Sequence, residues 1–276
     1  MAELQRLAIA PTQLQGEQIC LTAEQQHYLS RVLRLRSGDR FIAMNGKGQW
    51  WLAELLGSQD QALQARLVQT LSVDTELPIA ITLAVALPKG SGFDEVVRQA
   101  TELGLSCVAP VISDRTLLHP SPQKLERWRR IAQEAAEQSE RQVVPTILEP
   151  ISLLPQLQQL LATTTDTPPA IGYFCVTRYD APHLLNCLQQ DLRLADQQPP
   201  LSALSSMVIV TGPEGGWTEA EVEQAIALGY QPVSLGQRIL RAVTAPLVAL
   251  SLIAAVAEAT RVELSPPTCQ GEQKKL

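Results

Sequence analysis

The sequence lacks the features that mark secreted and membrane-spanning proteins. Its N-terminus has no basic segment followed by a long apolar run, so we expect no secretory signal. The one candidate membrane segment, residues 245–257, contains Pro246 and Ser251 and falls well short of the roughly 20 apolar residues that spanning requires. We expect this segment to be a buried helix or part of a subunit interface.

The cysteines and histidines of the sequence do not have the spacing of metal-binding motifs. The 5 cysteines are scattered, with no CxxC pair and no histidine at ligand spacing, and the 3 histidines stand far apart. Spacing therefore supports neither a zinc centre nor a Ser-His-Asp relay. We expect a protein of the reducing cytoplasm, without a metal ion and without a membrane anchor.

The residues that are present favour a folded protein with a sizeable core. Of the 276 residues, 45% are hydrophobic and 18% are charged, which argues against global disorder. A chain of this length suits one small and one medium domain.

Charge is unevenly distributed along the chain. The net charge of −6 argues against a generally basic coat that binds nucleic acid. Residues 27–47 nevertheless carry a net charge of +4, with four arginines in HYLSRVLRLRSGDRF. We expect Val32, Leu33 and Leu35 to supply the buried side of this segment. Two interpretations stay open: a solvated helix end, or an anchor for RNA phosphates, which position a nucleic acid without reading its sequence.

Residues 74–79 mark a change in pattern and a candidate domain boundary. Short alternating runs precede it, with Asn45-Gly46 as a hairpin signal, which predicts a small β-rich module. Strands and helices alternate after it, which predicts a mostly parallel sheet with helices on both faces. The predicted strands are 79–87, 108–112 and 170–176, and the predicted helices are 93–103 and 122–138.

The most informative stretch is VIVTGPEGGWTEAEVEQAIALGYQPVSLGQRILRAVTAP, residues 208–246. It predicts a strand, a glycine turn at 211–216, a helix, a second strand at 232–235, and a second glycine turn that opens another helix. Thr218 and Glu221 have the spacing of a capping box, in which each side chain bonds the backbone N–H of the other residue. Two such turns are what α/β proteins use to hold a small cofactor, although one glycine turn before a helix is as often structural.

The class of ligand follows from what these turns contain and lack. There is no GxGxxG for a dinucleotide and no GK[ST] for a nucleotide phosphate. Gly215 and Gly216 leave room for an adenine or ribose, while Glu214 would repel a phosphate, so an uncharged or cationic ligand fits better. In the second turn, Arg238 and Arg241 either pair with the preceding acidic helix or steady negative charge on a substrate. We favour the second role for Arg241.

Together with KGSGFDEVVRQATELG at 89–104 and EAAEQSERQVVP at 134–145, the GPEGG and LGQRILR motifs resemble those of the RsmE-type 16S rRNA (uracil-N3)-methyltransferases of the SPOUT class. The resemblance covers nearly the whole chain, including RVLRLRSGD. It implies an α/β protein with an N-terminal PUA-like β-barrel and a C-terminal SPOUT domain with a trefoil knot. It also implies S-adenosylmethionine as methyl donor, a homodimer, and 16S rRNA of the 30S subunit as substrate. The implied domains are 1–75, PUA-like and RNA-binding, 78–262, SPOUT methyltransferase, and 263–276, a disordered tail.

The resemblance also implies roles for individual residues. Arg241 would face the target base, where a cation would stabilise the negative charge left when N3 of a uridine loses its proton. Glu214 is a candidate proton acceptor, although a cap or cofactor role is equally natural for it. The implied cofactor-binding residues are Thr211, Gly212, Gly215, Gly216, Leu235, Gly236, Ile239 and Leu240. The implied RNA-binding residues are Arg6, Arg31, Arg34 and Arg36.

Some positions depart from the pattern of this family. Ala242 and Val243 stand where the family usually has a hydroxyl and a carboxylate, and Ser91 and Gly92 where it has a basic and an acidic residue. These changes concern substrate contacts more than cofactor binding. They indicate either a divergent branch with the same reaction or a shift in RNA target.

We therefore expect methyl transfer from S-adenosylmethionine to N3 of a uridine in 16S rRNA. Two alternatives stay open. One is another SPOUT activity, such as ribose 2'-O methylation of RNA, which the mass of the modified nucleoside fragments would distinguish. The other is a non-catalytic RNA-binding or ribosome assembly factor, which would have no affinity for the cofactor.

Overall fold

The computed structural model describes residues 4–56, 64–116, 120–161, 170–197 and 206–264. The chain divides into two compact units, one of residues 1–76 with 126–146 and the other of residues 77–125 with 147–276. The first unit is therefore discontinuous in sequence. Of the expected tail, residues 263 and 264 end a helix, and residues 265–276 lie outside the described part of the chain.

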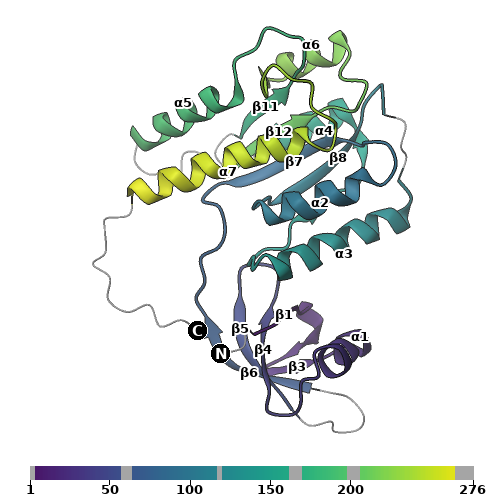
Figure 1. Ribbon diagram of the computed structural model, residues 1–276, viewed down its shortest axis with the longest axis vertical. Helices are drawn as coiled ribbons and strands as arrows, with labels where there is room; N and C mark the ends of the chain where they lie inside the picture. The colour runs from purple at the N-terminus through teal and green to yellow at the C-terminus, as the bar shows by residue number, and fades with distance from the viewer. Residues whose placement is uncertain (1–3, 57–63, 117–119, 162–169, 198–205, 265–276) are drawn as a thin grey trace. The chain divides into compact units, whose positions relative to one another are not determined.

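The first unit is built around a six-stranded sheet with the strand order β1-β4-β5-β6-β3-β2 (Figure 1). β4 and β5 form the hairpin that Asn45-Gly46 predicts, with Met44 opposite Trp50 in antiparallel register. Gly46 has φ +64°, a left-handed conformation that glycine adopts at little cost. The strands are β1 (Arg6–Ala8), β2 (Leu14–Gln15), β3 (Gln18–Cys20), β4 (Arg40–Met44), β5 (Trp50–Leu55) and β6 (Gln64–Leu71), and the short helices are η1 (Pro11–Gln13), α1 (Ala23–His27) and η2 (Tyr28–Val32).

We expected Val32 to lie on the buried side of the basic segment, but it is 58% exposed. Leu33 and Leu35 do pack against the core of the first unit. The reason is that η2 is a π-turn, in which the Leu33 N–H donates to the Tyr28 carbonyl five residues earlier. A π-turn holds one more residue than an α-helical turn and so shifts the facing of the side chains that follow.

Helix α3 (Pro122–Gln138) begins and ends where the sequence predicts. From residue 126 onward it groups with the first unit, and Glu137 links it to β1 by accepting a hydrogen bond from the Ala8 N–H at 2.8 Å. Burial raises the pKa of Glu137, while hydrogen bonds from Ala8 and Gln133 oppose that rise.

The second unit contains a seven-stranded sheet with the order β10-β8-β7-β12-β11-β13, and β9 also pairs with β8. Parallel pairing joins β10, β8, β7, β12, β11 and β13, as the alternation of strands and helices predicts. Because these strands run the same way, their carboxyl ends share one edge of the sheet. The strands are β7 (Ala80–Ala86), β8 (Cys107–Ile112), β9 (Thr146–Ile147), β10 (Ile151–Ser152), β11 (Ile171–Cys175), β12 (Ser206–Thr211) and β13 (Gln231–Val233).

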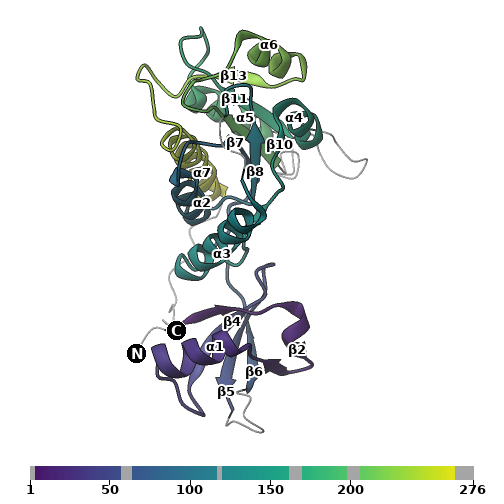
Figure 2. The ribbon, with the colours of Figure 1, turned by 90° about the vertical axis from the view of Figure 1, so that its right-hand side faces the viewer.

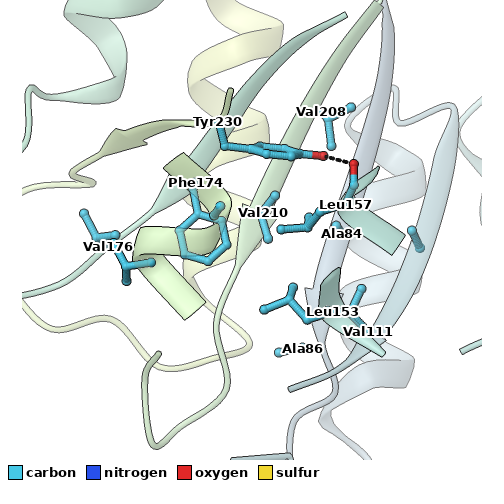
Figure 3. Packing of buried hydrophobic residues seen from close by; sticks show 13 residues of the cluster. Ala84, Ala86, Val111, Leu153, Leu157, Phe174, Val176, Val208, Val210 and Tyr230 are labelled. Carbon is cyan, nitrogen blue, oxygen red and sulfur yellow. Dashed lines mark hydrogen bonds between the residues drawn. The ribbon is translucent and has the colours of Figure 1, made fainter. Parts of the chain in front are cut away.

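Helices cover both faces of this sheet (Figure 2). On one face, α4 and α6 pack on a core in which Leu157, Phe174 and Val210 are completely buried (Figure 3). The Tyr230 hydroxyl closes this core by donating to the Leu157 carbonyl at 3.1 Å. On the other face, α7 contacts both α2 and α5. The helices are α2 (Gly92–Glu102), α4 (Leu153–Leu161), α5 (Leu184–Gln197), α6 (Glu219–Ala227) and α7 (Ala245–Leu264).

The prediction that the second glycine turn opens directly into a helix is wrong. Residues 235–244 form an irregular loop, and α7 begins only at Ala245. The N–H groups of Thr244 and Ala245 both donate to the Arg241 carbonyl, so a tight turn precedes the helix. Among the described residues, none of the helices combines the length and apolar character that crossing a membrane requires.

Candidate functional site

The two glycine turns lie at the same edge of the parallel sheet. The first follows β12 and the second follows β13, and these strands flank β11 on either side. With about 4.8 Å between neighbouring strands, the two strand ends are roughly 10 Å apart. The carboxyl edge of a parallel sheet is where open α/β proteins bind their ligands. The residues predicted to bind a cofactor are therefore brought together, although the turns are separate in sequence.

A tryptophan packs under the first turn. Trp217 Nε1 donates to the Cys175 carbonyl at 2.9 Å, and its ring lies 4.7 Å from that of Phe174. A Cβ added at Gly212 would come within 3.0 Å of the Trp217 ring. Glycine at this position therefore allows the turn to pass directly over the indole.

Two neighbouring loops hold the first turn by side-chain hydrogen bonds. Glu214 Oε1 accepts from the Lys89 N–H at 3.0 Å, which joins the turn to the loop after β7. Arg115, after β8, donates from Nη1 to the carbonyls of Gly215 at 2.5 Å and Trp217 at 3.2 Å. Sequence reasoning missed Arg115. Its one available signal was its place in the short polar run, residues 113–115, that directly follows a buried strand.

The predicted capping box is confirmed, and its glutamate has a second role. The Thr218 hydroxyl accepts from the Glu221 N–H at 3.2 Å, and Glu221 Oε2 accepts from the Thr218 N–H at 2.7 Å. Glu221 is only 4% exposed, and its Oε1 accepts from the Asp114 N–H at 3.0 Å. One carboxylate thus caps α6 and docks the loop after β8.

The side chain of Thr211 indicates where a ligand would bind. Thr211 ends β12 and is fully buried, and its Oγ1 has no hydrogen-bond partner among the described residues. A buried polar group left unpaired costs about 1–3 kcal/mol. A polar ligand at the carboxyl end of β12 would remove that cost, so the residues present fit a small cofactor with hydrogen-bonding groups.

The second turn is held more loosely and is more exposed. Gly236 has φ +112°, which other residues rarely adopt, and its N–H donates to the Ser234 hydroxyl at 3.1 Å. A Cβ at Gly236 would meet only His183 Nε2, at 4.0 Å. Ile239 is 65% exposed, and Arg241 is exposed. Leu235 and Leu240 are half-buried.

Gly92 and Val243, two of the positions that depart from the family pattern, lie against each other in the structure. A Cβ added at Gly92 would stand 2.6 Å from Val243 Cγ1, which is closer than any real contact of a Cβ atom. The valine side chain therefore occupies the space that a side chain at position 92 would need. The start of α2 and the loop that carries Arg241 are in contact through this pair.

The four arginines predicted to bind RNA differ in their surroundings. Arg31, Arg34 and Arg36 are exposed, and Arg34 has φ +58° between two leucines that pack on the core. Arg6 instead pairs with Glu140 at 2.7 Å, and its guanidinium lies over the Trp50 ring at 5.5 Å. Its side chain is 13% exposed. Arg6 is therefore placed to hold the first unit together, whereas the other three present their charge to solvent.

The described residues hold no cluster of three or more histidine, cysteine, aspartate or glutamate side chains placed to bind a metal ion. The four cysteines among them, Cys20, Cys107, Cys175 and Cys187, are free thiols. Burial raises the pKa of Cys107 to about 11 and that of Cys175 to about 12. Because only a thiolate is strongly nucleophilic, neither of these two thiols is activated.

Comparison with known proteins also divides the chain near residue 75, although it assigns residues 126–146 to the second domain rather than to the first unit. Residues 75–254 match a family described as the RNA methyltransferase domain, and residues 21–68 match the RNA methyltransferase PUA domain. The first unit is therefore a PUA-like sheet, and the second is an α/β methyltransferase domain.

Full-length relatives are similar over most of the chain. Ribosomal RNA small subunit methyltransferase E of Synechocystis sp. is 47% identical over 92% of this chain and 78% of its own length. The protein of the same name from Bacillus subtilis is 33% identical over 94% of this chain and 99% of its own. A crystal structure of the Neisseria gonorrhoeae protein of that name, bound to S-adenosyl methionine, is 28% identical with a TM-score of 0.73, over 95% of this chain and 100% of that one. The chain belongs to the ribosomal RNA small subunit methyltransferase E family of RNA methyltransferases.

Proposed function

We propose that this protein transfers a methyl group from S-adenosylmethionine to N3 of a specific uridine in the 16S rRNA of the small ribosomal subunit. One observation carries the proposal: two glycine turns meet at the carboxyl edge of the sheet, where the buried Thr211 hydroxyl has no partner among the described residues. Membership of the family supports the reaction class, and the resemblance of the sequence motifs supports N3 of uridine as the target atom.

The two turns would hold the cofactor between backbone and apolar side chains. When bound, S-adenosylmethionine supplies an electrophilic methyl group on a cationic sulfonium. Glu214 and Glu219 are exposed and carry negative charge beside the first turn, which favours a cationic ligand over a phosphate. The residues that we propose to hold the cofactor are Thr211, Gly212, Gly215, Gly216, Leu235, Gly236, Ile239 and Leu240.

Arg241 would act on the uridine. The nitrogen N3 carries a proton and becomes a nucleophile only when that proton leaves, which spreads negative charge onto the two flanking carbonyl oxygens. The Arg241 guanidinium stays protonated and is exposed, so it can approach those oxygens. A donor aimed at charge that develops in a transition state is worth about 3–4 kcal/mol.

Glu214 is our candidate for the group that takes the proton. One of its carboxylate oxygens accepts the Lys89 N–H, and no partner is recorded for the other among the described residues. A carboxylate with a free oxygen can accept a proton from a substrate placed within hydrogen-bond reach. The same geometry equally suits a purely structural link between two loops, so the variant Glu214→Gln separates these roles. It keeps an acceptor for Lys89 and removes the base.

The first unit would bind the RNA through its exposed arginines. Arg31, Arg34 and Arg36 lie within one segment that leaves and rejoins the sheet, so their charges are close together in sequence and face solvent. Such cations neutralise phosphates and release counterions, which makes the affinity depend on salt concentration. Only the resemblance of the sequence to the family supports Arg6 as an RNA-binding residue, because the Glu140 carboxylate already neutralises its charge.

We also propose that the protein acts as a homodimer in the cytoplasm. Helix α7 carries Leu247, Val248 and Leu252 only half-buried, and Ile239 in the second turn is 65% exposed. A second subunit would cover these apolar groups. The trefoil knot that the resemblance implies stays a prediction.

The test is methyl transfer from labelled S-adenosylmethionine to 30S subunits from cells that lack the protein, followed by mass spectrometry of the nucleosides. The proposal predicts 3-methyluridine. A 2'-O-methylated nucleoside would instead identify a ribose methyltransferase. Binding of 30S subunits without any affinity for the cofactor in calorimetry would identify a non-catalytic assembly factor.

A further inference from the structure

We propose that Arg115 is a positioning residue for the cofactor, because it fixes the backbone of the first glycine turn in the shape that receives S-adenosylmethionine. This inference rests on the proposed function. It adds a residue outside both glycine turns, from the loop after β8, to the machinery that binds the cofactor.

Arg115 makes more than one kind of contact with the turn. Its Nη1 donates to the carbonyls of Gly215 and Trp217, which lie 100 and 102 positions further along the chain. Its aliphatic stem lies on Gly215, where an added Cβ would be 3.1 Å from Cδ and 3.4 Å from Cβ of the arginine. The guanidinium holds two carbonyls, and the stem packs flat against the residue that carries one of them.

This contact changes the reason for glycine at position 215. We expected Gly215 and Gly216 to leave bare backbone for the adenine or ribose of a ligand. The side of Gly215 on which a Cβ would project is instead occupied by Arg115, while a Cβ at Gly216 would meet no atom within 4 Å. Gly216 has φ +67°, a left-handed conformation that the turn requires and that glycine adopts at little cost. Glycine at 215 therefore makes room for the side chain of Arg115.

The segment that carries Arg115 is itself anchored, so the arginine does not act as a free surface side chain. The Asp114 N–H donates to the buried Glu221 carboxylate, which also caps α6. In addition, the Ser113 N–H donates to the Thr116 hydroxyl at 3.0 Å, which closes the loop after β8 on itself. Arg115 thus projects from a loop fixed on both sides of it.

Hydrogen bonds from a charged donor to two carbonyls restrict rotation of the peptide groups that bear them. The peptides of Gly215 and Gly216 have no side chains to restrict them, so their conformational freedom is large without such a restraint. A cofactor that binds a turn already held in one shape avoids the entropic cost of ordering it. Loss of Arg115 should therefore weaken cofactor binding without touching the reacting atoms.

The experiment compares Arg115→Ala and Arg115→Lys with wild type and with Arg98→Ala as a matched control. Arg98 is an exposed arginine of the second unit that pairs with Glu95 on α2, away from the turns in sequence. Isothermal titration calorimetry would measure the Kd for S-adenosylmethionine, and hydrogen exchange with mass spectrometry would follow the amides of residues 212–217. The thermal unfolding midpoint of each variant would report its global stability.

We expect Arg115→Ala to weaken S-adenosylmethionine binding about tenfold, the effect of losing hydrogen bonds from one charged group. Amide exchange should rise in residues 212–217 and not across the sheet. Arg115→Lys, which keeps a charged donor, should recover part of the affinity. At saturating cofactor the kcat should equal that of wild type, because only KM for the cofactor depends on the shape of the turn. Arg98→Ala should change none of these quantities.

Two results would overturn the proposal. One is an unchanged Kd with unchanged exchange in residues 212–217. The other is a fall in the unfolding midpoint with faster exchange throughout the second unit, which would make Arg115 a general structural residue. If wild type itself binds no S-adenosylmethionine, the proposed function fails, and this outcome is distinct from a failure of the role of Arg115.

Discussion

The two glycine turns end neighbouring parts of one sheet but are held in different ways. Three side chains hold the first turn: Arg115 from the loop after β8, the turn's own Glu214, which accepts from the Lys89 N–H, and Trp217, which packs beneath it. The second has few such restraints. Within the described part of the chain, its side-chain hydrogen bonds join the Ser234 hydroxyl to the backbone of Gly236. The second turn also leaves Ile239 and Arg241 exposed.

This difference matches a division of work at the site. A turn that recognises a cofactor benefits from a fixed shape, because the cofactor is the same in each reaction cycle. The second turn would contact a large RNA through Arg241 and a second subunit through Ile239. Both contacts require exposed side chains. We therefore assign recognition of the cofactor mainly to the first turn, and contact with the substrate mainly to the second.

The largest expected effect tests the exposed turn. Arg241→Ala should lower the single-turnover rate of methyl transfer by roughly 100-fold to 1000-fold, the loss of about 3–4 kcal/mol of transition-state stabilisation. Its unfolding midpoint should not change, because Arg241 is exposed. Arg238→Ala, three residues earlier on the same loop, is the control and should change the rate little. A wild-type rate for Arg241→Ala would show that the second turn does not act on the substrate.

The next effect tests how firmly the first turn is held. Glu221→Ala should lower the free energy of unfolding by about 2 kcal/mol, because it leaves the backbone N–H groups of Thr218 and Asp114 without their carboxylate acceptor. Urea unfolding would measure the loss. The control Glu219→Ala alters an exposed acid in the first turn of the same helix and should cost less than about 0.5 kcal/mol. Equal losses for the two variants would refute the double role of Glu221.

A third test concerns the contact behind the second turn. Gly92→Ala should lower the free energy of unfolding by about 1–2 kcal/mol, because its new Cβ would overlap Val243 Cγ1. In the Val243→Ala background the same change should cost nothing measurable. A double-mutant cycle on urea unfolding would measure this coupling energy. Additive effects of the two substitutions would mean that Val243 moves away freely, and that the loop before α7 is not held at this point.

The smallest expected effect tests the unpaired hydroxyl at the end of β12. Thr211→Val should raise the stability of the cofactor-free protein by up to about 1 kcal/mol and weaken S-adenosylmethionine binding by about threefold to tenfold. These opposite signs are the signature of a polar group kept for a ligand. Thr101→Val is the matched control, because Thr101 is equally buried but its hydroxyl already donates to the Val97 carbonyl at 2.7 Å. A lower stability for Thr211→Val with unchanged cofactor affinity would contradict our assignment.

Features that depend on a few consecutive residues were predictable from the sequence. The capping box of Thr218 and Glu221, the hairpin at Asn45-Gly46 and the bounds of α3 are of this kind. Each depends on side-chain chemistry or periodicity over at most a few turns, and the structure confirms each. The parallel sheet was predictable for the same reason, because alternating strands and helices leave few other arrangements.

Local departures from regular helix, and contacts between distant segments, were not predictable. Val32 is exposed because a π-turn shifts its facing, and residues 235–244 form a loop where a helix was expected. The contact of Arg115 with Gly215 joins residues 100 positions apart, so no local pattern contains it.

By itself, the sequence determined the family of this protein, the alternation of strands and helices in its second unit, and the two glycine turns at which a cofactor would bind. Those properties follow from local backbone preferences and from motifs that are contiguous in the chain. Tertiary structure alone decided what holds each turn, that Val243 fills the space beside Gly92, and that the Thr211 hydroxyl is left without a partner among the described residues. The physical reason is that hydrogen bonding and close packing depend on distances of a few ångströms between side chains. Such distances are set only when the strands have paired and the loops have met.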